Sequence, residues 1–162
     1  MAPRGVFAAK NRLFVADTGR NRVFIWNSIP QKQYEEPDVV LGQIGVSEDG
    51  RNSGGDVSAH TLHYPSGIWS DGITLMVCDA WNHRVLIWHT LPTENGQAAD
   101  VVLGQPDFVS NKPNVSGIGS DPSARTLHWP YGVYSDGKSL WIADTGNRRI
   151  LLYDRIPKTN FT

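Results

Sequence analysis

The chain of 162 residues is 40% hydrophobic, 10% aromatic and 19% charged, which is the composition of a globular domain and not of a disordered segment. Its 15 Lys and Arg residues almost balance 16 Asp and Glu residues, so the net charge of −1 disfavours charge-driven binding to nucleic acid or to a membrane surface. The single cysteine, Cys78, excludes an internal disulfide and a cysteine-based zinc site, and no stretch approaches the roughly 18 consecutive apolar residues of a membrane span. A soluble domain is expected.

Three sequence markers recur with one period. The first begins at Leu13, Leu75 and Leu140, with spacings of 62 and 65 residues, and reads LFVADTGRNRVFIWNSIP, LMVCDAWNHRVLIWHTLP and LWIADTGNRRILLYDRIP. The second, DVVLGQ, occupies 38–43 and 100–105. The third reads TLHYPSGIWSDG from Thr61 and TLHWPYGVYSDG from Thr126. The common period predicts three copies of one structural unit.

A complete unit contains four short apolar runs, which in the middle copy span 67–70, 75–79, 85–89 and 100–103. Each run has the length of a strand, and Ser70-Asp71-Gly72 is a hairpin signal between the first two. Neighbouring residues within a run are often both apolar, so both faces of the sheet must be covered. The pattern predicts an all-β chain of four-stranded antiparallel sheets, arranged as in a β-propeller, with one helical turn at 121–126.

The units are placed at 3–43, 65–105 and 130–157 within a single domain that covers 1–162, and the last unit lacks its outermost strand. The motifs Pro-x-Gly-[Val/Ile], Leu-x-Val-x-Asp and Asn-x-Arg-[Val/Ile] resemble those of the NHL-repeat β-propeller family. The middle copy matches fully and the last copy matches at seven positions, whereas the first copy departs because Arg20 stands where Asn82 and Asn147 stand. The matching residues are Pro65, Gly67, Ile68, Asp79, Asn82, Arg84, Val85, Pro130, Gly132, Val133, Asp144, Asn147, Arg149 and Ile150. The resemblance implies a propeller, a fold that hosts scaffolds, RNA binders and enzymes.

Three units leave two apolar sheet faces uncovered, because a propeller closes with four to eight blades. We expect Phe14, Phe24 and Trp26 on one open face. The other is expected to carry Trp141, Leu151 and Tyr153. A two-fold homodimer would cover both faces and close a six-bladed ring, the usual number in the resembled family. The alternative is that the sequence is a fragment of a longer propeller.

The repeated Asp-x-x-Asn-x-Arg element is interpreted as structural, because a residue set needed once per unit is expected to stabilise that unit. In the middle copy, Asp79 and Asn82 are expected to satisfy backbone donors in the turn between the second and third strands. Arg84 is expected to pair with a carboxylate.

Candidate ligand-binding residues lie where the copies differ. Trp81 replaces Gly19 and Gly146 of the other copies, and an aromatic side chain on a polar turn is a possible stacking platform. The residues between the Pro and Gly of each first strand also differ and are expected at the mouth of the channel: Arg4, Ser66 and Tyr131. The turns add a modest basic set: Arg20, His83 and Arg148. Two long connections, 44–64 and 106–129, are expected on the same face.

His63 and His128 are weak candidates for a metal site at the channel, holding zinc or calcium, as in the amidating lyases of the resembled fold. Their repetition favours a local structural role, so no cofactor is expected. No nucleophile elbow, zinc-protease motif or phosphate loop is present in the sequence. The leading interpretation is a non-enzymatic module that presents a loop face to a protein, peptide or glycan. The alternatives are a metal-dependent lyase or hydrolase and an RNA-binding module. No residue pattern identifies the compartment.

Overall fold

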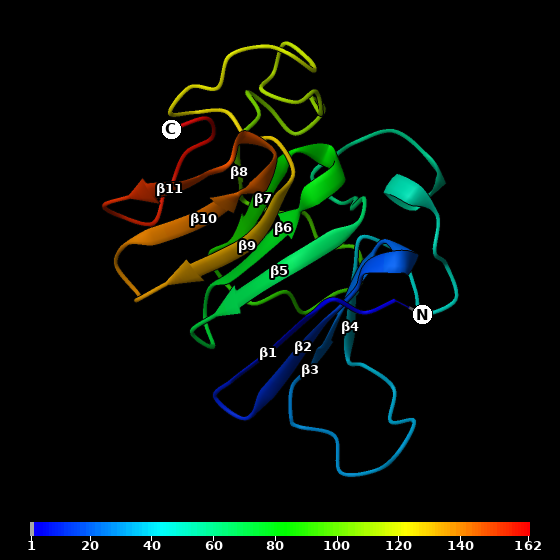
Figure 1. Cartoon of the computed structure of the whole chain (residues 1–162). Helices are drawn as coiled ribbons and strands as arrows, with labels where there is room; N and C mark the ends of the chain where they lie inside the picture. The colour runs from blue at the N-terminus through cyan, green and yellow to red at the C-terminus, as the bar shows by residue number, and fades with distance from the viewer. Residues whose placement is uncertain (1) are drawn as a thin grey trace.

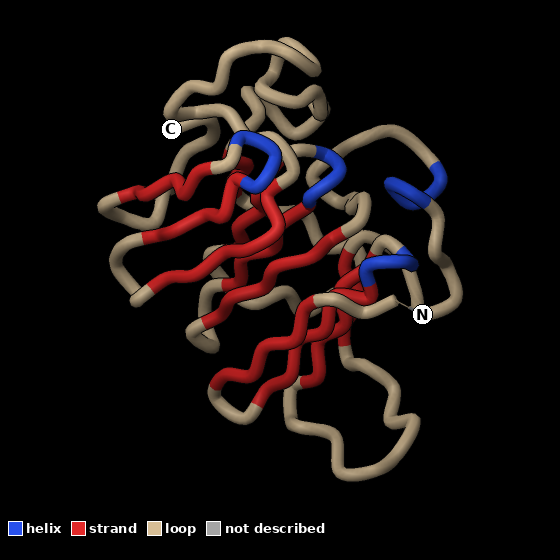
Figure 2. The backbone as a smooth tube through the Cα atoms, in the orientation of Figure 1, coloured by secondary structure: helices blue, strands red, loops and turns tan. Residues whose placement is uncertain are grey.

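The computed structural model describes residues 2–162, and these form three antiparallel sheets with almost no helix (Figures 1 and 2). The first sheet contains β1 (Gly5–Ala9), β2 (Arg12–Asp17), β3 (Arg22–Trp26) and β4 (Val39–Leu41). The second contains β5 (Pro65–Ser70), β6 (Leu75–Asp79), β7 (Arg84–Trp88) and β8 (Val101–Leu103). The third contains β9 (Pro130–Ser135), β10 (Leu140–Asp144) and β11 (Arg149–Tyr153). The expected all-β class is confirmed.

In the described part of the chain, helical structure is limited to four short 3-10 turns, and three of them follow the second strand of a sheet: η1 (Thr18–Arg20), η3 (Ala80–Asn82) and η4 (Thr145–Asn147). Only η2 (Arg51–Gly54) lies in a long connection. The helical turn expected at 121–126 is wrong. There, the Thr126 N–H donates to the Ser123 carbonyl at 3.4 Å and the Thr126 hydroxyl accepts a hydrogen bond from the Ser123 N–H at 2.8 Å. These bonds close one isolated turn at Ala124 and Arg125, which is not a helix. Within residues 2–162, no helix has the length and apolar character needed to cross a membrane.

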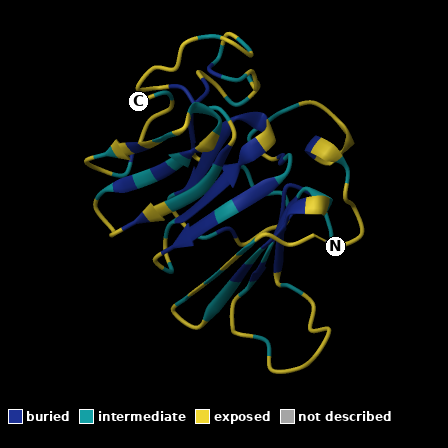
Figure 3. Cartoon of the chain, viewed as in Figure 1, coloured by how far each residue is buried: buried dark blue, intermediate teal, exposed yellow. Residues whose placement is uncertain are grey.

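The sheets lie side by side, with their first strands β1, β5 and β9 adjacent (Figure 1). One apolar cluster fills the space between the first and second sheets, and another fills the space between the second and third. Side chains alternate between them along β6, where Leu75 and Val77 face the first sheet and Met76 and Cys78 face the third. The middle sheet is therefore buried on both faces, as Figure 3 shows.

The outward faces of the first and third sheets carry partly different residues from those expected. Phe14 and Leu151, with relative exposures of 0% and 8%, point toward the middle sheet, and Tyr153 also packs on that side. The reason is the two-residue period of a strand, which turns each neighbour to the opposite face. The first open face instead presents Val15 beside the expected Phe24 and Trp26. The other presents Tyr134, Ile150 and Leu152 beside the expected Trp141.

Candidate functional site

The Asp-Asn-Arg element forms a buried network in the second sheet. The Arg84 Nε donates to Asp79 Oδ2 at 2.7 Å, and the Asn82 Nδ2 donates to the same oxygen at 2.8 Å. Asp79 Oδ1 accepts from the backbone N–H of His63 at 2.6 Å. The carboxylate therefore satisfies a donor in the loop before β5, not in its own turn as expected, while the expected ion pair of Arg84 is present.

The rest of the Arg84 guanidinium holds two long connections in place. Its Nη2 donates to the carbonyls of Ser58 and Thr61, each at 2.9 Å, and its Nη1 donates to the carbonyl of Phe108 at 2.7 Å. Asn52 adds a second anchor for the loop, since its Oδ1 accepts from Asn82 Nδ2 at 2.8 Å. These bonds fix the loop face relative to the sheet, so the repeated polar element is structural scaffolding for that face.

Trp81 lies in an aromatic cluster on this fixed face. Its indole stacks on the Tyr64 ring with a centroid distance of 4.8 Å and meets the His63 ring edge-on at 5.2 Å. The Arg4 guanidinium lies over the Tyr64 ring, 5.1 Å from its centroid. The Trp81 Nε1 donates to the Tyr131 hydroxyl at 3.4 Å. Trp81 keeps 44% of its surface exposed, so the cluster presents an aromatic surface to solvent.

A polar cavity of about 310 Å³ adjoins Trp81. Its wall combines the long loop, η3 and one residue of the second loop: Arg51, Asn52, Gly55, Asp56, Val57, His63, Trp81 and Asn111. Burial lowers the pKa of His63, against the raising effect of the Asp79 carboxylate, while the Arg51 guanidinium lowers it further. His63 is therefore a neutral hydrogen-bonding group at neutral pH. Such a cavity can hold polar groups while an apolar ring face packs on Trp81.

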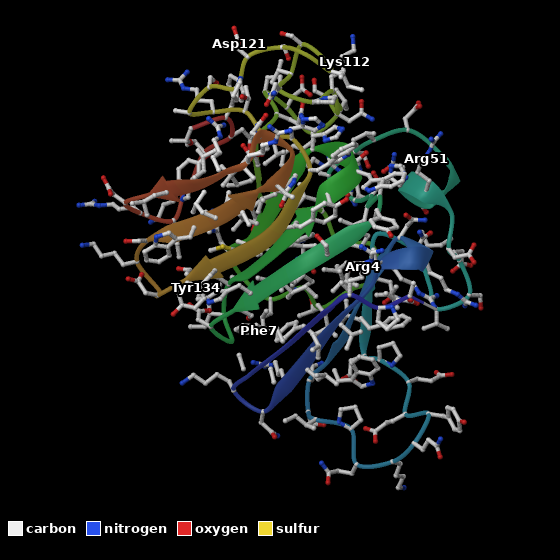
Figure 4. All side chains as sticks on the ribbon, in the orientation of Figure 1. Arg4, Phe7, Arg51, Lys112, Asp121 and Tyr134 are labelled. Carbon is white, nitrogen blue, oxygen red and sulfur yellow. The ribbon has the colours of Figure 1, made fainter. Side chains whose placement is uncertain are left out.

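A second cavity of about 440 Å³ lies where the three first strands meet. Arg4, Ser66 and Tyr131 all line it, so these equivalent positions are brought together at its wall. Tyr131 also contacts Trp81, which connects this cavity to the aromatic cluster. Figure 4 labels Arg4 before β1 and Arg51 on the long loop.

His83 is buried, with a relative exposure of 7%, and its ring links the second and third sheets. The His83 Nδ1 accepts the backbone N–H of Trp129 at 3.1 Å. Asn21 occupies the equivalent position one unit earlier and makes the equivalent bond, since its Oδ1 accepts the backbone N–H of Tyr64 at 2.9 Å. Burial lowers the pKa of His83 to about 4, and the nearby His128 and His63 lower it further. The neutral ring acts as an acceptor and positions Trp129.

The other predicted residues are spread over the turns. Arg20 lies in η1 and Arg148 directly follows η4, and neither lines the two cavities. His128 packs against the His83 ring at 5.2 Å, apart from the His63 and Trp81 contact. Residues 2–162 contain no group of three or more His, Cys, Asp or Glu side chains placed to hold a metal ion. Burial raises the pKa of the Cys78 thiol, so this thiol is not activated.

Sequence reasoning did not select Tyr64, Arg51 or Asp56. Tyr64 could have been selected from the sequence, because the residue before the proline is aromatic in both copies of the third marker. In the structure both residues have a positive φ, 56° at Tyr64 and 49° at Trp129. Bulky residues rarely adopt this conformation, which points to a constrained position. Asp56 begins a repeated segment, since Asp-x-Ser-Ala-x-Thr-Leu-His occupies both 56–63 and 121–128, whereas no repeated pattern marks Arg51.

A scan against models of protein families gives no match, and no curated protein sequence matches the chain. The resemblance to NHL repeats stays a prediction from the repeated motifs.

Proposed function

We propose that the chain is a non-enzymatic binding module whose loop face receives a protein, peptide or glycan ligand. The observation that carries the proposal is the half-exposed Trp81, stacked on Tyr64 beside the polar cavity. A ligand with one apolar ring face and several hydroxyl or amide groups fits both features. The bonds of Arg84 and Asn82 to the loops preorganise this face, so binding costs little ordering entropy.

The test is a screen of the purified chain on glycan and peptide arrays, followed by titration of each bound component. Trp81→Gly introduces the residue found at the equivalent turns, Gly19 and Gly146. This change is expected to lower the affinity for the bound array component at least about tenfold. Ile73→Ala is the control, because Ile73 is also an exposed large apolar side chain but lies in the hairpin between β5 and β6 and lines neither cavity. Equal affinities of wild type and Trp81→Gly would overturn the proposal, as would an array that captures nothing.

The proposed architecture is an NHL-like propeller that a homodimer closes into a six-bladed ring. The open face of the third sheet carries Tyr134, Trp141, Ile150 and Leu152, and the equivalent residues of the second sheet are all buried: Trp69, Met76, Val85 and Ile87. The open face of the first sheet has an apolar cavity of about 440 Å³, lined in part by Val15, Phe24 and Trp26. The two faces resemble the halves of an internal junction, which supports head-to-tail pairing of two copies.

A metal-dependent lyase or hydrolase and an RNA-binding module are the alternative functions. Metal analysis of the purified protein tests the first, since a site with zinc or calcium would retain one ion per chain. The affinity for RNA as a function of salt concentration tests the second, because phosphate contacts make binding steeply salt-dependent.

A further inference from the structure

A second exposed tryptophan, Trp129, lies on the loop face near the Trp81 cluster. Trp129 keeps 41% of its surface exposed, close to the 44% of Trp81. The His128 ring packs against its indole with a centroid distance of 4.6 Å, and the His83 ring lies 6.1 Å away. The indole is therefore supported by two imidazole rings and partly open to solvent, which suits it to stacking with a ligand.

The exposure of Trp129 follows from residues that differ between the second and third units. Its counterpart in the second unit, Tyr64, is covered by two side chains, since the Trp81 indole stacks on it and the Arg4 guanidinium lies over it. The positions equivalent to these two carry smaller residues around Trp129: Gly146 and Ser66. Neither residue has a side chain long enough to cover an indole, so the third unit leaves open a ring that the second unit covers.

Two hydrogen bonds hold Trp81 and Trp129 close to each other. The Trp81 Nε1 donates to the hydroxyl of Tyr131 at 3.4 Å, and Tyr131 lies two residues after Trp129. The Trp129 N–H donates to the Nδ1 of His83 at 3.1 Å, and His83 lies two residues after Trp81. Each tryptophan is thus bonded to the segment that carries the other. The loop face therefore presents two neighbouring indoles, which we call the paired tryptophans.

The polar cavity beside Trp81 offers both donors and acceptors. The Arg51 guanidinium can only donate, the Asp56 carboxylate can only accept, and the Asn111 amide can do both. Within residues 2–162, neither Arg51 nor Asp56 takes part in an ion pair. Their opposite charges cancel across the cavity wall. The cavity is therefore suited to a neutral ligand that donates and accepts hydrogen bonds.

A neutral oligosaccharide fits these features better than a peptide does. A sugar ring has an apolar C–H face that packs on an indole, and its hydroxyl groups can donate to Asp56 and accept from Arg51. Proline-rich peptides also pack on aromatic side chains. However, proline has no N–H, so such a peptide would leave the Asp56 carboxylate without a donor.

We propose that the paired tryptophans bind two sugar rings of one neutral oligosaccharide. One ring packs on Trp81 with its hydroxyl groups in the polar cavity, and another ring packs on Trp129. This inference rests on the function proposed for the loop face, because it names the ligand class of the Trp81 site and adds a second site at Trp129.

The experiment is isothermal titration calorimetry of the purified chain with linear neutral hexasaccharides of glucose, xylose, mannose and N-acetylglucosamine. At least one series is expected to bind with one hexasaccharide per chain. The corresponding monosaccharide can occupy only one site at a time and should bind at least about tenfold more weakly. A hexasaccharide that binds no more tightly than its monosaccharide would overturn the inference. Failure of every hexasaccharide, with a peptide captured on the array, would overturn the ligand class and leave the proposed function standing.

Two variants of Trp129 test the second site. Trp129→Asn removes the ring while allowing the positive φ of 49°, which asparagine adopts readily, and it should lower hexasaccharide affinity at least about tenfold. Trp129→Tyr is the matched control, because it introduces the residue of the equivalent position, Tyr64, and should retain most of the affinity. Melting temperatures verify that both variants fold, and the comparison of sugar lengths depends on neither. Unchanged affinity of a folded Trp129→Asn variant would refute the second site and leave the Trp81 site in place.

Discussion

Replacing Arg84 with Ala is expected to be among the most destabilising single changes in this chain. The side chain is fully buried and makes four hydrogen bonds, one to the Asp79 carboxylate and three to loop carbonyls. Alanine removes all four donors at once. It also leaves Asp79, itself at 0% exposure, as a buried carboxylate without its cationic partner.

Breaking a buried ion pair by removing one partner costs about 3–5 kcal/mol, and the orphaned carbonyls act in the same direction. Arg149 offers a comparison inside the same protein, because it pairs with Asp144 in the same way but its side chain is 28% exposed. Water can replace part of its bonds, so Arg149→Ala is expected to cost about 1–2 kcal/mol.

Urea unfolding followed by tryptophan fluorescence measures both variants against wild type, with the slope of the transition as a check on two-state behaviour. The reasoning predicts a clearly larger loss for Arg84→Ala than for Arg149→Ala. Equal losses would show that burial does not set the energy of this pair. An unchanged midpoint for Arg84→Ala, with ligand binding lost, would show that the repeated element is functional and not structural.

Two further predictions concern buried titratable groups. The pKa of His83 is about 4 in the folded chain against 6.5 as its ordinary value, so the unfolded state binds more protons between these values and the free energy of unfolding should fall as pH decreases from 6.5 to 4. At about 1.4 kcal/mol per unit the loss is at most about 3.5 kcal/mol. His83→Asn introduces the residue found at the equivalent position, Asn21, and should flatten the pH dependence of the urea midpoint. A pH dependence unaffected by this change would contradict the assignment. Cys78 is fully buried and its thiol pKa is raised, so it should react with a thiol reagent only in denaturant. Rapid labelling of the native chain would show that the second and third sheets are not packed as described.

The repeat period and the apolar runs were sufficient to predict the three sheets, because each run has a strand's length and is bounded by turn formers. The first strand of the middle sheet was expected at 67–70 and begins earlier, at Pro65. The orientation of Phe14 and Leu151 was harder to predict. Both neighbours in these strands are apolar, so only the observed pairing, such as Phe14 opposite Ile25, decides which residue faces the middle sheet.

The site was only partly predictable for a similar reason. Trp81 was found by comparing the copies, and Arg4 and Tyr131 by their equivalence at the first strands. Their contacts depend on Tyr64, whose ring bridges Arg4 and Trp81. His83 was grouped with the basic residues of the turns, but burial keeps it neutral and directs it to Trp129. Burial is a property of the packed chain and leaves no local sign in the sequence.

The last prediction concerns ring closure and rests on the glycines of the first strands. A Cβ at Gly67 would lie 2.8 Å from the Tyr131 carbonyl oxygen of the next sheet, and a Cβ at Gly5 would clash with the Ser66 carbonyl. Both glycines are therefore required for close approach of neighbouring first strands. Within residues 2–162 no further sheet packs against the equivalent Gly132, and the nearest contact of a Cβ there would be the Ala143 Cβ at 3.3 Å.

Gly132→Ala should therefore be tolerated by the folded monomer and disfavoured in a head-to-tail dimer, where Gly132 would meet the main chain near Arg4 of a second copy. Light scattering coupled to gel filtration is expected to give twice 17.9 kDa for wild type and a mass closer to 17.9 kDa for the variant, with the same melting temperature at dilutions where both are monomeric. Gly55→Ala is the control, because a Cβ there meets nothing closer than 3.9 Å in an exposed loop, and it should remain dimeric. A monomeric wild type at micromolar concentration would refute the ring. If Gly132→Ala is as dimeric as wild type, the two copies pair through surfaces other than these sheet faces. In both internal junctions the first strands approach so closely that they leave no room for an added methyl group.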